Sequence, residues 1–337
     1  MKKLLLSAVS ATLFFPQLSM AGEEVNVYSY RQAFLVEPLF KEFTDETGIK
    51  VNVKFAREGF TEMLKHEGRL SPADIILTTD VGHLVELSDE GLVKSVNNDV
   101  VNNNIPSQYR DSEGEWYALT LRTRNVQSSK DRIGRLPNDF DYLDLADPKW
   151  KGKICTRSGK HHYNISLVSS VIAHHGEEKA KEWLEGFKDN LARKPQGNDR
   201  GQIKAVKEGL CDIAVSNSYY FGIMMADENQ RSWAESVYIN FPGQELHGTH
   251  VNVSGMAMAK HAPNSDNAIK LMEFLSGSKA QEMYAAANFE YPVKPGVQPT
   301  ELVASWGEFD ADALSLEKIS QYRSTAVRLL DEVQFDL

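Results

Sequence analysis

The sequence predicts an α/β protein with two lobes, and three observations carry this prediction. The chain has 337 residues, which is more than one hydrophobic core usually serves. Strand-like and helix-like segments alternate in βαβα order near the amino end, and the same order returns after residue 150. Two further strand-like segments, 116–121 and 251–259, lie where the chain has to pass between the two units. We therefore expect a mainly parallel sheet flanked by helices in each lobe, with crossover strands joining the lobes.

The first unit opens with apolar and polar residues in alternation at 25–28, as in a half-buried strand. The segment 35–48 then places Leu35, Leu39 and Phe43 on one helical face and ends at a glycine. Alternation returns at 51–55. This order of elements predicts a strand, a helix and a second strand. A buried strand at 73–77 and an amphipathic helix ending at Gly91 complete the unit.

The second unit has strand-like residues at 154–155, followed by a helix at about 165–175. A further amphipathic segment carries Trp183, Leu184 and Phe187, and a third helix carries Ile203 and Val206. The apolar strand 211–215 follows it. Beyond residue 302 the pattern is helical. We predict one lobe from 22–121 plus 247–297, and the other from 122–246 plus 298–337.

The amino end has the features of a signal peptide. Lys2 and Lys3 precede an apolar run at 4–15, which is too short to span a bilayer. Small residues at Ser19 and Ala21 predict cleavage after residue 21. The sequence shows no other run that would serve as a membrane anchor, and no cysteine stands at the cleavage site to carry a lipid. We expect a periplasmic protein that is monomeric and not anchored to a membrane.

The net charge limits which partners the protein can bind, and the cysteine content bears on the compartment in which it folds. The formal net charge of -10 opposes binding to a phosphate backbone, so nucleic acid is not expected as a partner. The two cysteines, Cys155 and Cys211, are expected to form a disulfide because an exported protein folds in an oxidising compartment.

Tyrosines follow several of the predicted strands. In open parallel sheets, ligands collect beyond the carboxyl ends of the strands. Tyr30 and Arg31 follow the first strand, Tyr163 follows the strand at 154–155, and Tyr219 and Tyr220 follow the strand at 211–215. Phenolate is a hard anionic oxygen ligand, which suits a hard and highly charged ion such as Fe(III). If the chain stayed extended there, the two adjacent tyrosines would point to opposite faces, so both reach one ion only if the chain turns.

Several motifs around these tyrosines resemble those of the ferric-iron-binding proteins of ABC uptake systems. They are the runs 153–159 (KICTRSG), 163–167 (YNISL), 194–199 (KPQGND) and 217–220 (NSYY). The resemblance covers essentially the whole chain after the signal peptide. It implies a two-lobe periplasmic binding fold of type II, with Fe(3+) held in the cleft by Tyr163, Tyr219 and Tyr220. It also implies delivery of the iron to an inner-membrane ABC permease.

The sequence departs from this family after the first strand. Many members carry a His-Tyr pair there, whereas this chain has Gln32 and Ala33. Tyr30 and Gln32 are candidates for additional ligands. Fe(III) with three phenolates is formally neutral and lacks about three of its six ligands. Carbonate, bicarbonate or another small anion would fill them, and Arg122 and Arg31 are placed to bind that anion.

The residues by themselves leave other functions possible. The pairs at 161–162 and 174–175 suggest zinc, but their spacing is not that of a zinc site and there is no His-Glu-x-x-His motif. Nothing in the sequence matches a P-loop or a nucleophile motif, so an enzyme is not expected. The alternatives are a binding protein for an organic anion or a polyamine, and a periplasmic hydrolase. A coloured ferric complex would separate iron binding from these.

Overall fold

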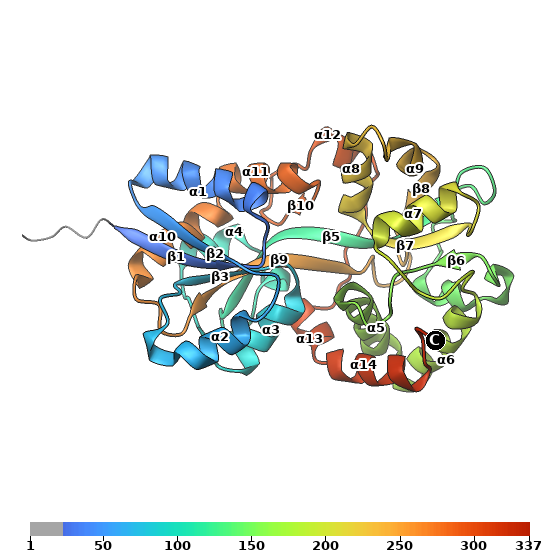
Figure 1. The fold of residues 1–337 in the computed structure, drawn as a ribbon, viewed down its shortest axis with the longest axis horizontal. Coiled ribbons are helices and arrows are strands. Elements are labelled where there is room, and N and C mark those ends of the chain that lie inside the picture. The colour runs from blue at the N-terminus through green and yellow to red at the C-terminus, as the bar shows by residue number, and fades with distance from the viewer. Residues whose placement is uncertain (1–22) are drawn as a thin grey trace, which may run out of the picture.

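The computed structural model describes residues 23–337. The predicted signal peptide, 1–21, lies outside the described residues. Two α/β lobes lie next to each other and are joined by two long strands, β5 (Trp116–Ser129) and β9 (Val251–Ala259) (Figure 1). Both predicted crossover strands are confirmed, and the first extends to Ser129. Within residues 23–337, no helix combines the length and the apolar character that crossing a membrane requires.

The first lobe is built on a sheet in the order β2-β1-β3-β9-β5. Its strands β1, β2 and β3 are parallel, whereas β9 runs antiparallel to β3 and to β5. The strands of this lobe are β1 (Glu24–Ser29), β2 (Lys50–Phe55), β3 (Ile75–Thr78), β4 (Val93–Lys94) and β10 (Tyr291–Pro292). Its helices are α1 (Ala33–Thr47), α2 (Phe60–Glu67), α3 (Val81–Asp89), α4 (Asp99–Asn104), α10 (Ser265–Ser276) and α11 (Ser278–Asn288).

The second lobe continues the sheet through β5, β7 and β6. Its strands are β6 (Ile154–Cys155), β7 (Ile213–Asn217) and β8 (Val237–Asn240). Its helices are α5 (His162–His175), α6 (Glu177–Asp189), α7 (Asp199–Lys207), α8 (Ser218–Ala226) and α9 (Arg231–Glu235). Strand β5 pairs with β9 over its first half and with β7 and β8 over its second half. One strand therefore belongs to both lobes.

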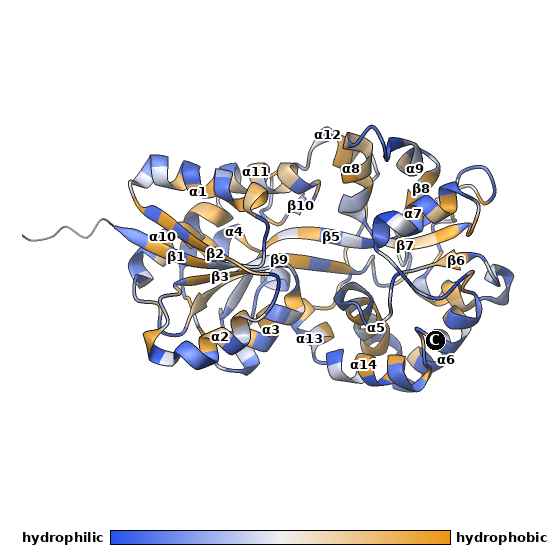
Figure 2. Cartoon of the chain, viewed as in Figure 1, coloured by the Kyte–Doolittle hydropathy of each residue, from blue (hydrophilic) through white to orange (hydrophobic). Residues whose placement is uncertain are grey.

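Each lobe has its own hydrophobic core. The first core gathers the apolar residues of β1, β3 and β9 with those of α1, α3 and α10, and the second gathers α5 and α6 around β7. In Figure 2, β3 and β7 are hydrophobic along most of their length, whereas α6 and α14 carry hydrophobic and hydrophilic residues in alternation. This is the pattern of strands covered on both faces and of helices with one face in water.

The carboxyl-terminal segment contacts both cores. It contains the short helices α12 (Glu301–Ala304) and α13 (Leu316–Ser320) and ends with α14 (Arg323–Glu332). Val303 and Trp306 belong to the first core, whereas Leu329 and Leu330 belong to the second. The segment therefore spans the two lobes.

Candidate metal centre

A cavity of about 430 Å³ lies where residues of the two lobes face each other. It is lined by Tyr30, Arg31, Gln32, Phe34, Leu35, Thr79, Arg122, Tyr163, Arg200, Tyr219, Tyr220, Ile223 and Asn288. Every residue that the sequence predicted as an iron ligand or an anion-binding group lies in this wall. Their roles as ligands stay predictions.

Helix starts place the three predicted iron ligands. Tyr163 lies in the first turn of α5, where its backbone N–H donates to Nδ1 of His161 at 3.3 Å. Helix α8 begins at Ser218, directly after β7, so Tyr219 and Tyr220 occupy its first turn. The chain therefore turns where the sequence argument required it. The hydroxyl oxygens of Tyr163 and Tyr219 are 2.8 Å apart, and the rings of Tyr219 and Tyr220 lie 4.2 Å apart.

Burial sets the protonation of this group. It raises the pKa of Tyr163 and Tyr219 above the usual value. The charge of a neighbouring Tyr220 phenolate raises the pKa of both further, whereas Arg122 lowers that of Tyr163. Both phenols therefore carry their protons at neutral pH and share one O–H···O hydrogen bond. A cation that binds these oxygens has to displace protons, which a highly charged ion does most effectively.

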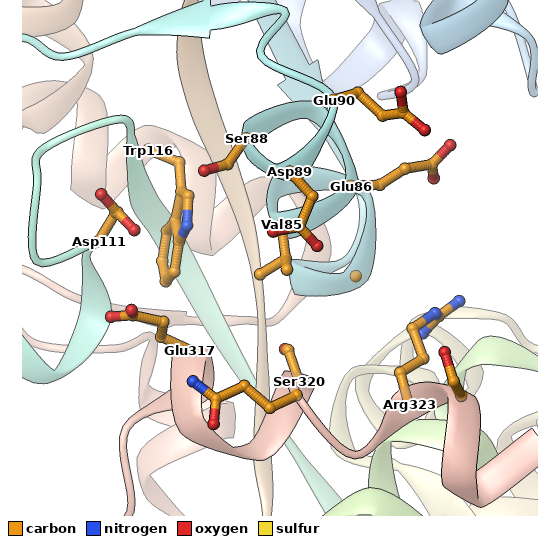
Figure 3. Close-up of a pocket in the computed structure, with 13 residues that line it drawn as sticks. Val85, Glu86, Ser88, Asp89, Glu90, Asp111, Trp116, Glu317, Ser320 and Arg323 are labelled. Atoms are coloured by element: carbon orange, nitrogen blue, oxygen red, sulfur yellow. The ribbon is translucent and has the colours of Figure 1, made fainter.

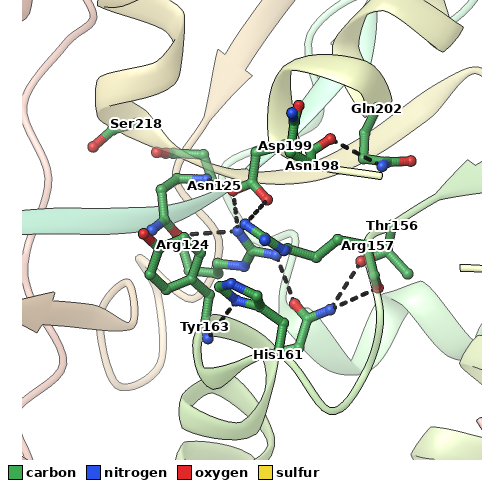
Figure 4. A network of polar contacts seen from close by, with 12 residues as sticks. Arg124, Asn125, Thr156, Arg157, His161, Tyr163, Asn198, Asp199, Gln202 and Ser218 are labelled. Atoms are coloured by element: carbon green, nitrogen blue, oxygen red, sulfur yellow. Dashed lines mark hydrogen bonds and ion pairs between the residues drawn. The ribbon is translucent and has the colours of Figure 1, made fainter. Parts of the chain in front are cut away.

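A buried network of charged and amide groups lies behind Tyr163 (Figure 4). Asp199 accepts from Arg124 Nη1 at 2.6 Å and from Arg157 Nη1 at 3.0 Å. The guanidinium carbons of Arg124 and Arg157 lie 5.8 Å and 5.1 Å from the centre of the Tyr163 ring. Arg124 Nη2 also donates to Asn164 at 2.6 Å. Two guanidinium groups and the carboxylate that they share therefore lie against the ring of Tyr163.

Sequence reasoning did not assign roles to Arg124, Arg157 or Asp199. Arg157 and Asp199 lie in the runs 153–159 and 194–199 that carried the family resemblance, so a signal was present for these two. Their arrangement around one ring was not readable, because Arg124 and Asp199 are 75 positions apart in the chain.

Arg122 lies on β5, in the wall of the cavity, with only 2% of its surface exposed. Its Nη2 donates to the backbone carbonyl of Thr79. Its Nε and Nη1 have no hydrogen-bond partner among residues 23–337. Leaving buried guanidinium donors unpaired is costly, so the anion-binding role predicted for Arg122 fits its surroundings and stays a prediction.

Of the other predicted residues, Arg31 and Tyr30 have partners of their own. Arg31 is buried and its Nη2 pairs with Glu290 Oε1 at 3.2 Å. The Tyr30 hydroxyl accepts from the backbone N–H of Phe60 at 2.8 Å, and burial raises its pKa. Gln32 is exposed and stands at the N-cap of α1, without a side-chain capping bond.

The predicted disulfide is confirmed. Cys155 and Cys211 are bonded, with their Cα atoms 5.9 Å apart, and close a loop with a sequence separation of 56. This bond ties β6 to the residues just before β7. It therefore links the two strands that lead to Tyr163 and Tyr219, and a loop of this length stabilises the fold by about 2–4 kcal/mol.

A second cavity has a different lining. It also measures about 430 Å³ and lies between α3 and α13, near Trp116 (Figure 3). Glu86, Asp89 and Glu317 line it together with Arg323. Carboxylates dominate this cavity, whereas arginines and phenols line the first one.

Comparison with known proteins identifies the family. The model of the family described as bacterial extracellular solute-binding protein matches residues 71–307. The chain belongs to this family. The solute-binding protein is 40% identical over 334 residues to iron uptake protein A1 of Synechocystis, which covers 97% of this chain and 92% of the relative. Its two lobes and crossover strands form the type II periplasmic binding fold.

Two solved structures are similar over nearly the whole solute-binding protein. Ferric iron-binding protein A of Mannheimia haemolytica, in an open conformation, matches with a TM-score of 0.90 and 54% identity, over 94% of this chain and 99% of that chain. A Trichodesmium protein in complex with iron and citrate matches with a TM-score of 0.89 and 37% identity, over 93% and 99% of the two chains. The expected fold class is confirmed.

Proposed function

We propose that this solute-binding protein captures ferric iron in the periplasm and delivers it to an inner-membrane ABC permease. Tyr163, Tyr219 and Tyr220 bind the iron through their phenolate oxygens. The observation that carries the proposal is the meeting of these tyrosines in one cavity, with two hydroxyl oxygens 2.8 Å apart. Relatives named for iron uptake and ferric iron binding support the choice of cargo.

The electrostatics of the cavity support a ferric complex completed by an anion. Three phenolates neutralise Fe(3+), and about three of six coordination positions remain. Carbonate, bicarbonate or a related small anion occupies them. Arg122 supplies charge and free N–H donors to that anion, and Arg31 adds positive charge at the same wall. Tyr30 and Gln32 stand at this wall as candidate additional ligands.

The lining of the cavity disfavours a polyamine as cargo. Arg31, Arg122 and Arg200 all line it, and a polycation would meet like charge there. An organic anion suits these arginines and is the remaining alternative. It needs no phenolates, so a test on the tyrosines separates the two. The protein acts as a carrier in this proposal, without a catalytic step.

The decisive experiment is a ferric titration followed by visible spectroscopy. The parent protein is expected to develop a phenolate-to-iron charge-transfer band, with a red or orange colour. Tyr219→Phe and Tyr220→Phe should each abolish the band, since each loses one ligand oxygen and little packing area. Tyr238→Phe is the matched control, because Tyr238 lies on β8 of the same lobe and does not line the cavity. A parent that stays colourless, or a Tyr219→Phe/Tyr220→Phe double variant that binds iron as the parent does, would refute the tyrosine site.

A further inference from the structure

A three-residue turn, 288–290, begins at the last residue of helix α11 and reaches the iron cavity from the amino-terminal lobe. We name it the cleft turn. Asn288 ends the helix and lines the cavity. Phe289 has a φ of 55°, in the left-handed region that side chains other than glycine rarely adopt. Glu290 comes next and is fully buried. Phe289 is the C-cap of α11 and its backbone N–H donates to the carbonyl of Ala285, so the left-handed residue ends the helix and turns the chain.

Glu290 bonds to residues from three separate segments. Its Oε1 accepts from Arg31 Nη2 at 3.2 Å and from Asn288 Nδ2 at 2.6 Å. Its Oε2 accepts from the Thr120 hydroxyl, which in turn bonds to Ser254. Thr120 and Ser254 are opposite each other on the crossover strands β5 and β9. One carboxylate thus connects two residues of the cavity wall to the strands that join the lobes.

The Arg31–Glu290 pair is charged and well enclosed. Burial opposes ionisation of Glu290, but the attraction of Arg31 and Arg122 lowers its pKa below the usual value. Arg31 is held on its other side by Tyr284, whose ring centre lies 5.1 Å from the guanidinium carbon. The guanidinium therefore has a fixed place in the wall. It lines the same cavity as Tyr219 and Tyr220.

Phe289 extends the turn to the opposite lobe. A methyl group placed on Gly222 of helix α8 would overlap the Phe289 side chain, so the ring lies directly on the helix backbone. Gly222 stands one helical turn beyond Tyr219. The cleft turn therefore contacts the helix that carries two of the three tyrosines.

We propose that Glu290 is a positioning residue for the iron site. It holds Arg31 and Asn288 in the wall of the cavity that faces the tyrosines, and it fixes this wall to the crossover strands. The amino-terminal lobe then contributes oriented charge and hydrogen-bond donors to the ferric complex and its anion. This inference rests on the proposed function, because ferric binding is its readout.

The first test compares two buried carboxylates of the same lobe. Glu290→Gln keeps the shape of the side chain and removes the charge that holds Arg31. Asp74→Asn is the matched control, since Asp74 is also fully buried and bonds to Asn26 and Asn264, outside the cavity wall. In competition against a ferric chelator, Glu290→Gln should lose about ten- to a hundredfold in iron affinity, the range typical of groups that act on a metal site from outside its first coordination sphere. Asp74→Asn should bind iron as the parent does, even if its melting temperature falls.

The second test separates positioning from general stability. Glu290→Gln leaves the Arg31 charge buried and unpaired, and the double variant Arg31→Gln/Glu290→Gln removes that charge as well. We expect the double variant to regain melting temperature while its iron affinity stays as low as that of Arg31→Gln alone. It also serves as the test if Glu290→Gln does not fold.

Three results would overturn the inference. The first is that Glu290→Gln binds iron as tightly as the parent. The second is that the double variant regains iron affinity as well as melting temperature. Independent, additive losses from Arg31→Gln and Glu290→Gln are the third, because residues that act through each other are not additive. A parent without a ferric charge-transfer band would refute the proposed function itself, which sets that failure apart from a failure at Glu290 alone.

Discussion

Removal of Arg122 tests the anion in the proposed complex. In Arg122→Ala, the bound anion loses a buried guanidinium whose Nε and Nη1 have no partner among the described residues. One charge-assisted hydrogen bond contributes about 1.5–3 kcal/mol, which corresponds to roughly ten- to a hundredfold in affinity. Two donors are available, so the loss should reach at least the lower figure. The backbone carbonyl of Thr79 also loses its donor, which affects stability rather than the anion.

The assay is a competition titration against a ferric chelator, with and without bicarbonate, for the parent and the variant. With bicarbonate, Arg122→Ala should bind iron roughly ten- to a hundredfold more weakly than the parent. Without it, the two proteins should converge, because the guanidinium then has no anion to bind. Arg110→Ala controls for loss of an arginine outside the cavity, since Arg110 does not line it. Equal affinities for the parent and Arg122→Ala under both conditions would refute the reasoning, and Tyr30 or Gln32 would then be the first candidates for the missing ligands.

Two further predictions concern the tyrosines. Gly222→Ala should cost about 1–3 kcal/mol through overpacking against the cleft turn and should weaken iron binding by displacing α8. Gly201→Ala, where an added methyl group would meet only Asn198 Oδ1 at 3.8 Å, should bind iron as the parent does; equal binding by both variants would contradict the contact. Because burial raises the pKa of Tyr163 and Tyr219, iron affinity should fall as the pH falls from 8 to 6, by about tenfold per pH unit for each proton displaced. Titrations at several pH values measure this slope, and a flat profile would mean that these phenols do not bind the metal.

Local patterns in the sequence were enough for the elements of the fold. A run rich in Val, Met and Ala identified the strand Val251–Ala259 with both of its ends. The glycine that was predicted to end α1 is Gly48, with a φ of 74°. These features can be predicted because helices and strands depend on the spacing and types of residues that are close together in the chain. The position of Tyr163 after a strand and near the start of a helix was predictable for the same reason.

The turn at Tyr219 and Tyr220 was not decided by the sequence. Alternation in a strand would have sent the two rings to opposite faces, whereas α8 begins at Ser218 and places both in its first turn. The ring of Phe289 from the other lobe packs on Gly222 of that helix. The start of α8 is therefore accompanied by a contact between residues that are far apart in the sequence. A pattern of nearby residues carries no information about such a contact.

The sequence by itself therefore determined the order of helices and strands, the pairing of the two cysteines, and which residue types follow the strands. The tertiary structure alone decided which charges meet. Arg31 and Glu290 are 259 positions apart and form a buried pair. Within residues 23–337, two donors of Arg122 have no partner. The physical reason is that a buried charge is stabilised by the groups that the fold brings within hydrogen-bond distance of it. Which groups these are depends on the packing of every segment between them in the chain.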